Sequence, residues 1–152
     1  MRSLIPLALI ALTAVASGAP GPKDAPAKEA PDIAGEWVLV SLSIGGQAIP
    51  LEFVAGRTEF TAAGKRVEHN RKGDDVMGER FFKLDRKASP PTIDFSEKIG
   101  GPITTRGIYG IDGDMLKICS TPVDPAIPRP TKLEAPAGSK FVLAEYKRVK
   151  KN

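Results

Sequence analysis

The sequence has 152 residues, a formal net charge of +4 and an ordinary hydrophobic content of 41%, which together suit one globular domain. Most Lys and Arg residues are interleaved with Asp and Glu, whereas a dedicated nucleic-acid binder gathers them on one face or in a run, so no nucleic-acid partner is expected. The 15 glycines and 14 prolines favour many turns over long helices. Cys119 is the one cysteine, which excludes an intramolecular disulfide.

The first 16 residues predict a cleavable signal peptide. Arg2 supplies the positive start, and the apolar run from Leu4 to Ala16 has the length of a signal-peptide core. Ala14-Val15-Ala16 fits the small-x-small cleavage pattern, so we expect cleavage after Ala16, with cleavage after Ala19 as the alternative. The run is short for a membrane span. We therefore expect an exported protein (periplasmic, cell-surface or secreted) with no stable membrane insertion after cleavage; a retained anchor is the alternative.

Residues 17–31 read SGAPGPKDAPAKEAP and contain no aromatic or large aliphatic side chain. Such a segment buries too little apolar surface to offset the entropy of ordering, which predicts a disordered linker. The folded domain is expected at residues 32–149, and residues 150–152 form a basic tail that we expect to be solvated.

Residues 32–149 predict an all-β domain. Short apolar segments alternate with turn signals at the spacing of a sandwich or barrel, and no window keeps a helical period over three turns. Asp112-Gly113 is the strongest hairpin signal, since this pair tolerates the positive φ angles of a type I′ turn. In chain order the predicted strands are Glu36–Ile44, Arg57–Thr61, Arg66–Arg71, Val76–Leu84, Thr92–Ser96, Thr104–Ile111, Met115–Cys119 and Phe141–Val149.

The free edges of these strands favour a closed sheet. The segment from Pro122 to Pro136 carries five prolines and predicts a long ordered loop or lid rather than a strand or helix. Successive strands joined by short hairpins leave two bare edges, and closure into a barrel removes both. We therefore predict one eight-stranded antiparallel, mostly up-and-down barrel in which Phe141–Val149 pairs with Glu36–Ile44; an open sandwich is the alternative.

Several segments carry a resemblance to a known family. Gly35-Glu36-Trp37 looks like the Gly-x-Trp signature of lipocalins. It is followed in order by Phe82–Asp85, Thr92–Phe95, Gly107–Cys119 and Pro128–Thr131. Together these segments resemble an uncharacterised lipocalin-like secreted domain family expanded in planctomycete bacteria, over nearly all of residues 32–149. The resemblance implies a barrel fold and an extracytoplasmic location, and it brings no established activity.

The resemblance also implies structural roles for particular residues. In lipocalins a basic residue of the last strand packs over the Trp of Gly-x-Trp. Lys147 or Arg148 could take that position, and Arg148 is preferred because a guanidinium stacks well on an aromatic face. Gly35, Trp37 and Arg148 are thus expected to be structural, as are Asp112 and Gly113 at their turn.

No residue pattern predicts catalysis, a metal or a cofactor. His69, the one histidine, lies on a charged strand and is expected at the surface, away from the partners that a triad or zinc site needs. Cys119 has no base nearby in sequence and is expected to be a buried structural residue. Asp74-Asp75 and Asp112-Gly113-Asp114 lack the ligand spacing of a calcium loop and are interpreted as turns.

The function is therefore sought in the barrel interior. We expect a non-catalytic extracytoplasmic module that binds a small apolar ligand or a partner protein. The candidate ligand-binding residues are Trp37, Phe82, Arg106 and Tyr109, because pockets combine apolar walls with few polar anchors. One alternative is a structural, cell-envelope-associated protein whose barrel is filled by side chains. A second is a hydrolase with two converging carboxylates such as Glu59 and Glu79.

Overall fold

The computed structural model describes residues 29–72 and 75–150, so the predicted signal peptide and most of the predicted linker lie outside the described residues. This part of the chain contains nine strands, one three-residue 3-10 turn and no α-helix, and hence no helix able to span a membrane. The elements are β1 (Gly35–Ile44), β2 (Gln47–Ala48), η1 (Leu51–Phe53), β3 (Arg57–Phe60), β4 (Lys65–His69), β5 (Val76–Asp85), β6 (Thr92–Ser96), β7 (Ile103–Asp112), β8 (Met115–Pro122) and β9 (Val142–Arg148).

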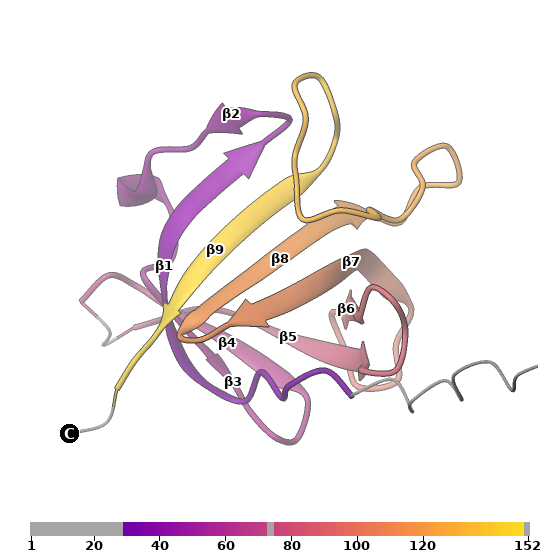
Figure 1. Cartoon of the computed structure of the whole chain (residues 1–152). Helices are drawn as coiled ribbons and strands as arrows, with labels where there is room; N and C mark the ends of the chain where they lie inside the picture. Colours follow the sequence, from indigo (N-terminus) through magenta and orange to yellow (C-terminus); the bar gives the residue numbers. More distant parts are fainter. Residues whose placement is uncertain (1–28, 73–74, 151–152) are drawn as a thin grey trace, which may run out of the picture.

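Eight of the strands form a closed antiparallel barrel. From β3 to β9 each strand pairs with the next along the chain, β1 pairs with β3, and β9 returns to pair with β1 (Figure 1). The closing register runs from Trp37 opposite Arg148 to Ile44 opposite Val142. The predicted up-and-down barrel is thereby confirmed, and the alternative of an open sandwich is wrong.

Most strand positions agree with the alternation of apolar and polar residues, and the differences have local causes. The short strand β2 and the turn η1 were not predicted, because both are exposed and too short to carry a pattern. Strand β8 continues past its predicted end at Cys119, since Thr121 and Pro122 pair with Arg106 and Thr105 of β7. The Gly113-Asp114 hairpin turn has a positive φ only at Gly113, which corresponds to type II′ rather than the predicted type I′.

The barrel has one end that is plugged by the chain itself, here called the closed end. It carries the β3–β4, β5–β6 and β7–β8 connections, and the segment of residues 29–34 crosses it before entering β1 (Figure 1). Ile33 of this segment is fully buried against the core, and its carbonyl accepts a 2.9 Å hydrogen bond from Nε1 of Trp37. The opposite end, called the open end, carries the β1–β3, β4–β5, β6–β7 and β8–β9 connections.

The ordered domain starts earlier than predicted. Ala30 and Pro31, expected in the linker, are joined to the barrel. The amide of Ala30 donates to the carbonyl of Arg86 at 3.0 Å, and Nε of Arg86 donates back to the carbonyl of Ala30 at 2.6 Å. The hydroxyl of Tyr109 donates to the carbonyl of Pro31 at 3.4 Å. These hydrogen bonds, together with the burial of Ile33, offset the entropy that the segment loses.

A long segment of residues 123–141, here called the strap, joins β8 to β9 and covers the outer wall of the barrel. Strands β3 and β6 bury every second residue, as expected for a sheet with one wet face. Strands β7 and β8 instead bury neighbouring residues, because the outward-facing Ile108 and Cys119 are buried as well, and Cys119 contacts Glu134 of the strap. The proline-rich segment was predicted as a loop or lid, and the structure shows a loop against the wall.

Candidate functional site: a cavity at the open end

A cavity of about 270 Å³ occupies the half of the barrel next to the open end. Its walls combine nine apolar and eight polar residues from the surrounding strands and the β1–β3 connection. It communicates with solvent at the open end, where Pro122 is exposed and the side chain of Arg80 is 42% exposed. The apolar residues that line it are Leu39, Leu42, Val54, Ala55, Phe95, Ile118, Pro122, Val142 and Ala144, and the polar ones are Thr58, Arg66, Glu68, Arg80, Thr105, Ser120, Thr121 and Tyr146.

A part-buried arginine, Arg66 of β4, lines the inner part of this cavity. Nη2 of Arg66 donates to Oε1 of Glu68 at 2.6 Å and to the hydroxyl of Tyr146 at 3.2 Å. The guanidinium also lies 5.4 Å from the ring centroid of Phe95 and 6.0 Å from that of Phe60. Burying a charge is costly unless it is paired and hydrogen-bonded, and these contacts offset part of that cost, while Nε of Arg66 is buried without a hydrogen-bond partner. Arg66 is thereby fixed in one orientation.

A second arginine lies at the mouth. Arg80 of β5 faces the cavity, and its Nε is 3.3 Å from Oε1 of Glu97 in the β6–β7 connection. The side chain of Glu97 is 55% exposed, so water screens this ion pair. The ion pair between Arg80 and Glu97 at the mouth is therefore weak.

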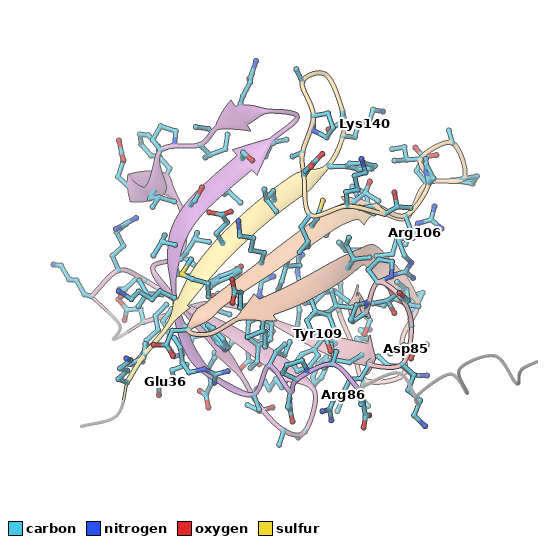
Figure 2. The ribbon with its side chains drawn as sticks, in the orientation of Figure 1. Glu36, Asp85, Arg86, Arg106, Tyr109 and Lys140 are labelled. Atoms are coloured by element: carbon cyan, nitrogen blue, oxygen red, sulfur yellow. The ribbon has the colours of Figure 1, made fainter. Side chains whose placement is uncertain are left out.

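Two of the four predicted ligand-binding residues lie inside the barrel but outside the cavity. Trp37 and Tyr109 are fully buried in the packed half next to the closed end, where Figure 2 shows Tyr109 close to Arg86. Burial raises the pKa of the Tyr109 hydroxyl above its ordinary value. Both residues belong to the core, and neither is available to a ligand in the cavity.

The other two predicted residues have different surroundings. Phe82 faces inward and packs edge-on against Phe60, with ring centroids 5.4 Å apart, below the cavity floor. Arg106 was expected in the interior, and that placement is wrong. Its neighbour Thr105 faces the cavity, so Arg106 faces outward, and Nη2 donates to the carbonyls of Asp124 and Ile127 in the strap (Figure 2).

The residues predicted to be structural lie at the closed end. The guanidinium of Arg148 lies 4.1 Å from the Trp37 ring centroid, which is the contact expected from the resemblance, and its Nη1 donates to the carbonyl of Ala34 at 3.2 Å. Gly35 adopts a φ of 130°, and a Cβ there would lie 3.1 Å from Nη1 of Arg148. Asp112 and Gly113 lie at the β7–β8 hairpin.

Cys119 and His69 lie on separate strands, β8 and β4. Cys119 is fully buried, its Sγ donates to the carbonyl of Glu134 at 3.2 Å, and burial raises the pKa of its thiol. His69 is half-buried, so its expected place at the open surface is only partly correct. In the described residues no three His, Cys, Asp or Glu side chains gather as a metal site. Asp74 lies outside the described residues, and Asp75 accepts a hydrogen bond from Asn70.

The two carboxylates considered for a hydrolase do not converge in the interior. Glu59 and Glu79 pair from either side with Val67 in the sheet register. Since the alternate residues Thr58, Arg66 and Arg80 face the cavity, this row faces outward.

The polar residues of the cavity were missed because their strand has a misleading pattern. In β4 Val67 lies between Arg66 and Glu68, so alternation alone would turn Val67 inward and the charges outward. The observed facing is the reverse, because Arg66 pairs with Phe60 and Arg80 in neighbouring strands, and Phe60 lies in the core. This cross-strand register is the signal that would have identified the site, and it is not encoded locally.

Comparison of the chain with protein-family profiles, with curated proteins and with solved structures returned no match. The site is therefore interpreted from its own geometry.

Proposed function

We propose that this chain is a non-catalytic module that binds one small, mostly apolar molecule in the cavity at the open end of its barrel. The observation that carries the proposal is the cavity itself: about 270 Å³ of unfilled space, lined by nine apolar and eight polar residues and reached from solvent. A barrel that served only as a scaffold would be expected to fill its interior with side chains. Here the closed half is filled and the open half is not.

The volume sets the size of the ligand. An apolar cavity of about 150 Å³ is enough to bind benzene, and drug-sized ligands occupy pockets of about 300 Å³ or more. The present cavity falls between these limits. It therefore fits a single substituted ring or a short aliphatic chain, and it excludes a sterol or a full-length lipid from complete enclosure.

The surface around the mouth supports an apolar ligand as well. Among the described residues, seven of the nine exposed large apolar side chains lie in the connections of the open end or at the strand ends beside them. They offer contact to any part of a ligand that the cavity does not enclose. These residues are Ile44, Phe53, Val76, Met77, Ile99, Ile103 and Val123.

We also propose that the chain is lipocalin-like and exported. The first part is supported by the pairing of Gly35 and Trp37 with Arg148 and by the N-terminal segment that closes one end of the barrel. The second rests on the signal-peptide pattern of residues 1–16. Secretion of the chain by its native host, with removal of the first 16 residues shown by N-terminal sequencing, is the test of the export proposal.

A cavity-filling substitution tests the binding proposal. Ala144→Leu adds bulk at a buried lining position, whereas Ala126→Leu makes the same change at an exposed strap residue. Titration with toluene and with octan-1-ol, followed through ring signals of Tyr146 and Phe95 by NMR, should show saturable binding to the parent protein. We expect Ala144→Leu to weaken binding at least about tenfold, which corresponds to about 1.4 kcal/mol, and Ala126→Leu to leave it unchanged.

The choice of signal matters, because Trp37 is fully buried in the closed half and its fluorescence is a poor reporter of the cavity. Equal binding by the parent and Ala144→Leu would place the probes outside the cavity and contradict the proposal. Failure of both probes, together with the remaining members of a panel of small aromatic and aliphatic compounds, would contradict it as well.

A further inference from the structure

We infer that the cavity selects a small amphipathic acid, whose carboxylate binds Arg80 at the mouth while its apolar body points inward. This inference rests on the proposed binding function and specifies the class of ligand. It follows from the charged side chains that face the cavity, from their ion-pair partners and from how exposed each of them is.

The charged side chains that line the cavity carry more positive than negative charge. They comprise two guanidinium groups, Arg66 and Arg80, and one carboxylate, Glu68. Glu68 is already engaged by Arg66 at 2.6 Å. The cavity lining therefore keeps one positive charge, which favours an anionic group over a cationic or neutral one.

Arg66 is a poor choice for the anionic group of a ligand. Nη2 is occupied by Glu68 and Tyr146, and an incoming carboxylate would meet the charge of Glu68 at close range. The side chain of Arg66 is 14% exposed, so a carboxylate reaching it would also lose most of its hydration. The role of Arg66 is to neutralise Glu68 and complete the floor.

Arg80 has the opposite properties. Its side chain is 42% exposed, so a carboxylate bound there keeps part of its hydration shell. Its partner Glu97 is 55% exposed and contributes little to stability, as exposed ion pairs generally do. A ligand carboxylate can therefore replace Glu97 at small cost, and the fork of the guanidinium can hold both of its oxygens.

The apolar lining lies inward of this point. Leu39, Phe95, Ile118 and Ala144 line the cavity and are themselves buried in the core cluster. A ligand with its acid at Arg80 would place its ring or alkyl chain against these residues. The volume of about 270 Å³ restricts that body to a single ring or a short chain.

Matched acids and amides test the inference. We would measure dissociation constants by calorimetry for 3-phenylpropanoate and octanoate, each against its primary amide, at pH 7 and low ionic strength. The parent should prefer each acid by about fivefold or more, the size expected for one partly exposed ion pair. Arg80→Gln should abolish this preference by lowering the affinity for each acid to about that of its amide, and Glu97→Gln should tighten acid binding because the competing carboxylate is gone.

Arg57→Gln is the matched control, since Arg57 is similarly exposed and pairs with Glu36 on the outer wall of the barrel. It should keep the preference for acids. Amides that bind as well as acids, or a preference that survives in Arg80→Gln, would overturn the inference while the cavity-filling experiment still supported the proposed function. Stronger binding of octylamine than of octanoate would also overturn it. Loss of every probe from the parent protein would count against both.

Discussion

Single residues at the closed end make one interlocked group around Trp37. The indole nitrogen donates to the carbonyl of Ile33, and the ring face is covered by the guanidinium of Arg148. Arg148 in turn reaches the carbonyl of Ala34, and Gly35 leaves room for it. A cation over a buried Trp contributes both electrostatic attraction and packing of its aliphatic stem. This group ties the last strand to the segment that precedes the first.

Removal of Arg148 should therefore destabilise the protein measurably. We expect Arg148→Ala to lower the free energy of unfolding by about 1–3 kcal/mol, through the lost stacking and the lost hydrogen bond to Ala34. Lys147→Ala is the control, because Lys147 is the adjacent basic residue and is exposed. Urea titration followed by Trp37 fluorescence measures both. Equal effects of the two substitutions would contradict the role given to Arg148.

At the scale of elements, the strap behaves as a second layer on the barrel wall. Arg129 of the strap makes two hydrogen bonds to the carboxylate of Asp94 in β6, at 2.6 and 3.0 Å, and a third to the carbonyl of Gly107 in β7 at 2.7 Å. Pro130 beside it is fully buried. The strap contacts Cys119 through the carbonyl of Glu134, and burial raises the pKa of the Cys119 thiol.

Loosening the strap should expose that thiol. Asp94→Asn removes the charge that holds Arg129, and we expect the labelling rate of Cys119 by a disulfide reagent to rise about tenfold. A charge-assisted pair of this kind contributes about 1.5 kcal/mol, which sets that factor. Cys119 is the only thiol in the chain, so the signal is unambiguous. Asp112→Asn, at an exposed hairpin residue, should leave the rate at the parent value; an unchanged rate in Asp94→Asn would show that the strap is held elsewhere.

The elements were largely predictable and the site was not, for a physical reason that β4 illustrates. Alternation and turn residues are local properties, so strands such as β6 and the β7–β8 hairpin could be located from sequence alone. Which face of β4 points inward depends on its register with β3 and β5, which is set by contacts distant in sequence. Arg66 and Glu68 were missed for that reason. Arg106 was misplaced because the strap offers it partners outside the barrel.

At the scale of the whole molecule, the two ends of the barrel differ in kind. The largest fully buried side chains include Trp37, Tyr109, Phe60 and Ile33, which pack together toward the closed end, while the open end keeps the cavity. The packed core and the cavity are thus separated along the barrel axis. Such a separation allows residues near the mouth to vary in size and charge without disturbing the core.

Two isoleucines at opposite ends should show this separation. Ile33→Ala removes a fully buried side chain from the plug, and we expect a loss of about 2–4 kcal/mol of unfolding free energy. Ile99→Ala makes the same change at a residue that is 80% exposed, and we expect an effect below about 0.5 kcal/mol. Thermal and urea unfolding of the two variants are the measurements. Similar losses would refute the assignment of stability to the closed end.

The chain enters and leaves the barrel on the same side. Glu29 lies 3.8 Å from Arg86 after β5, and Lys150 lies 3.0 Å from Asp114 in the β7–β8 hairpin, so both contacts belong to the end opposite the cavity. A resin, a sensor chip or a fused protein that is attached near Glu29 or Lys150 is therefore held at the closed end of the barrel. The mouth of the cavity would then point away from the support and stay accessible to solvent.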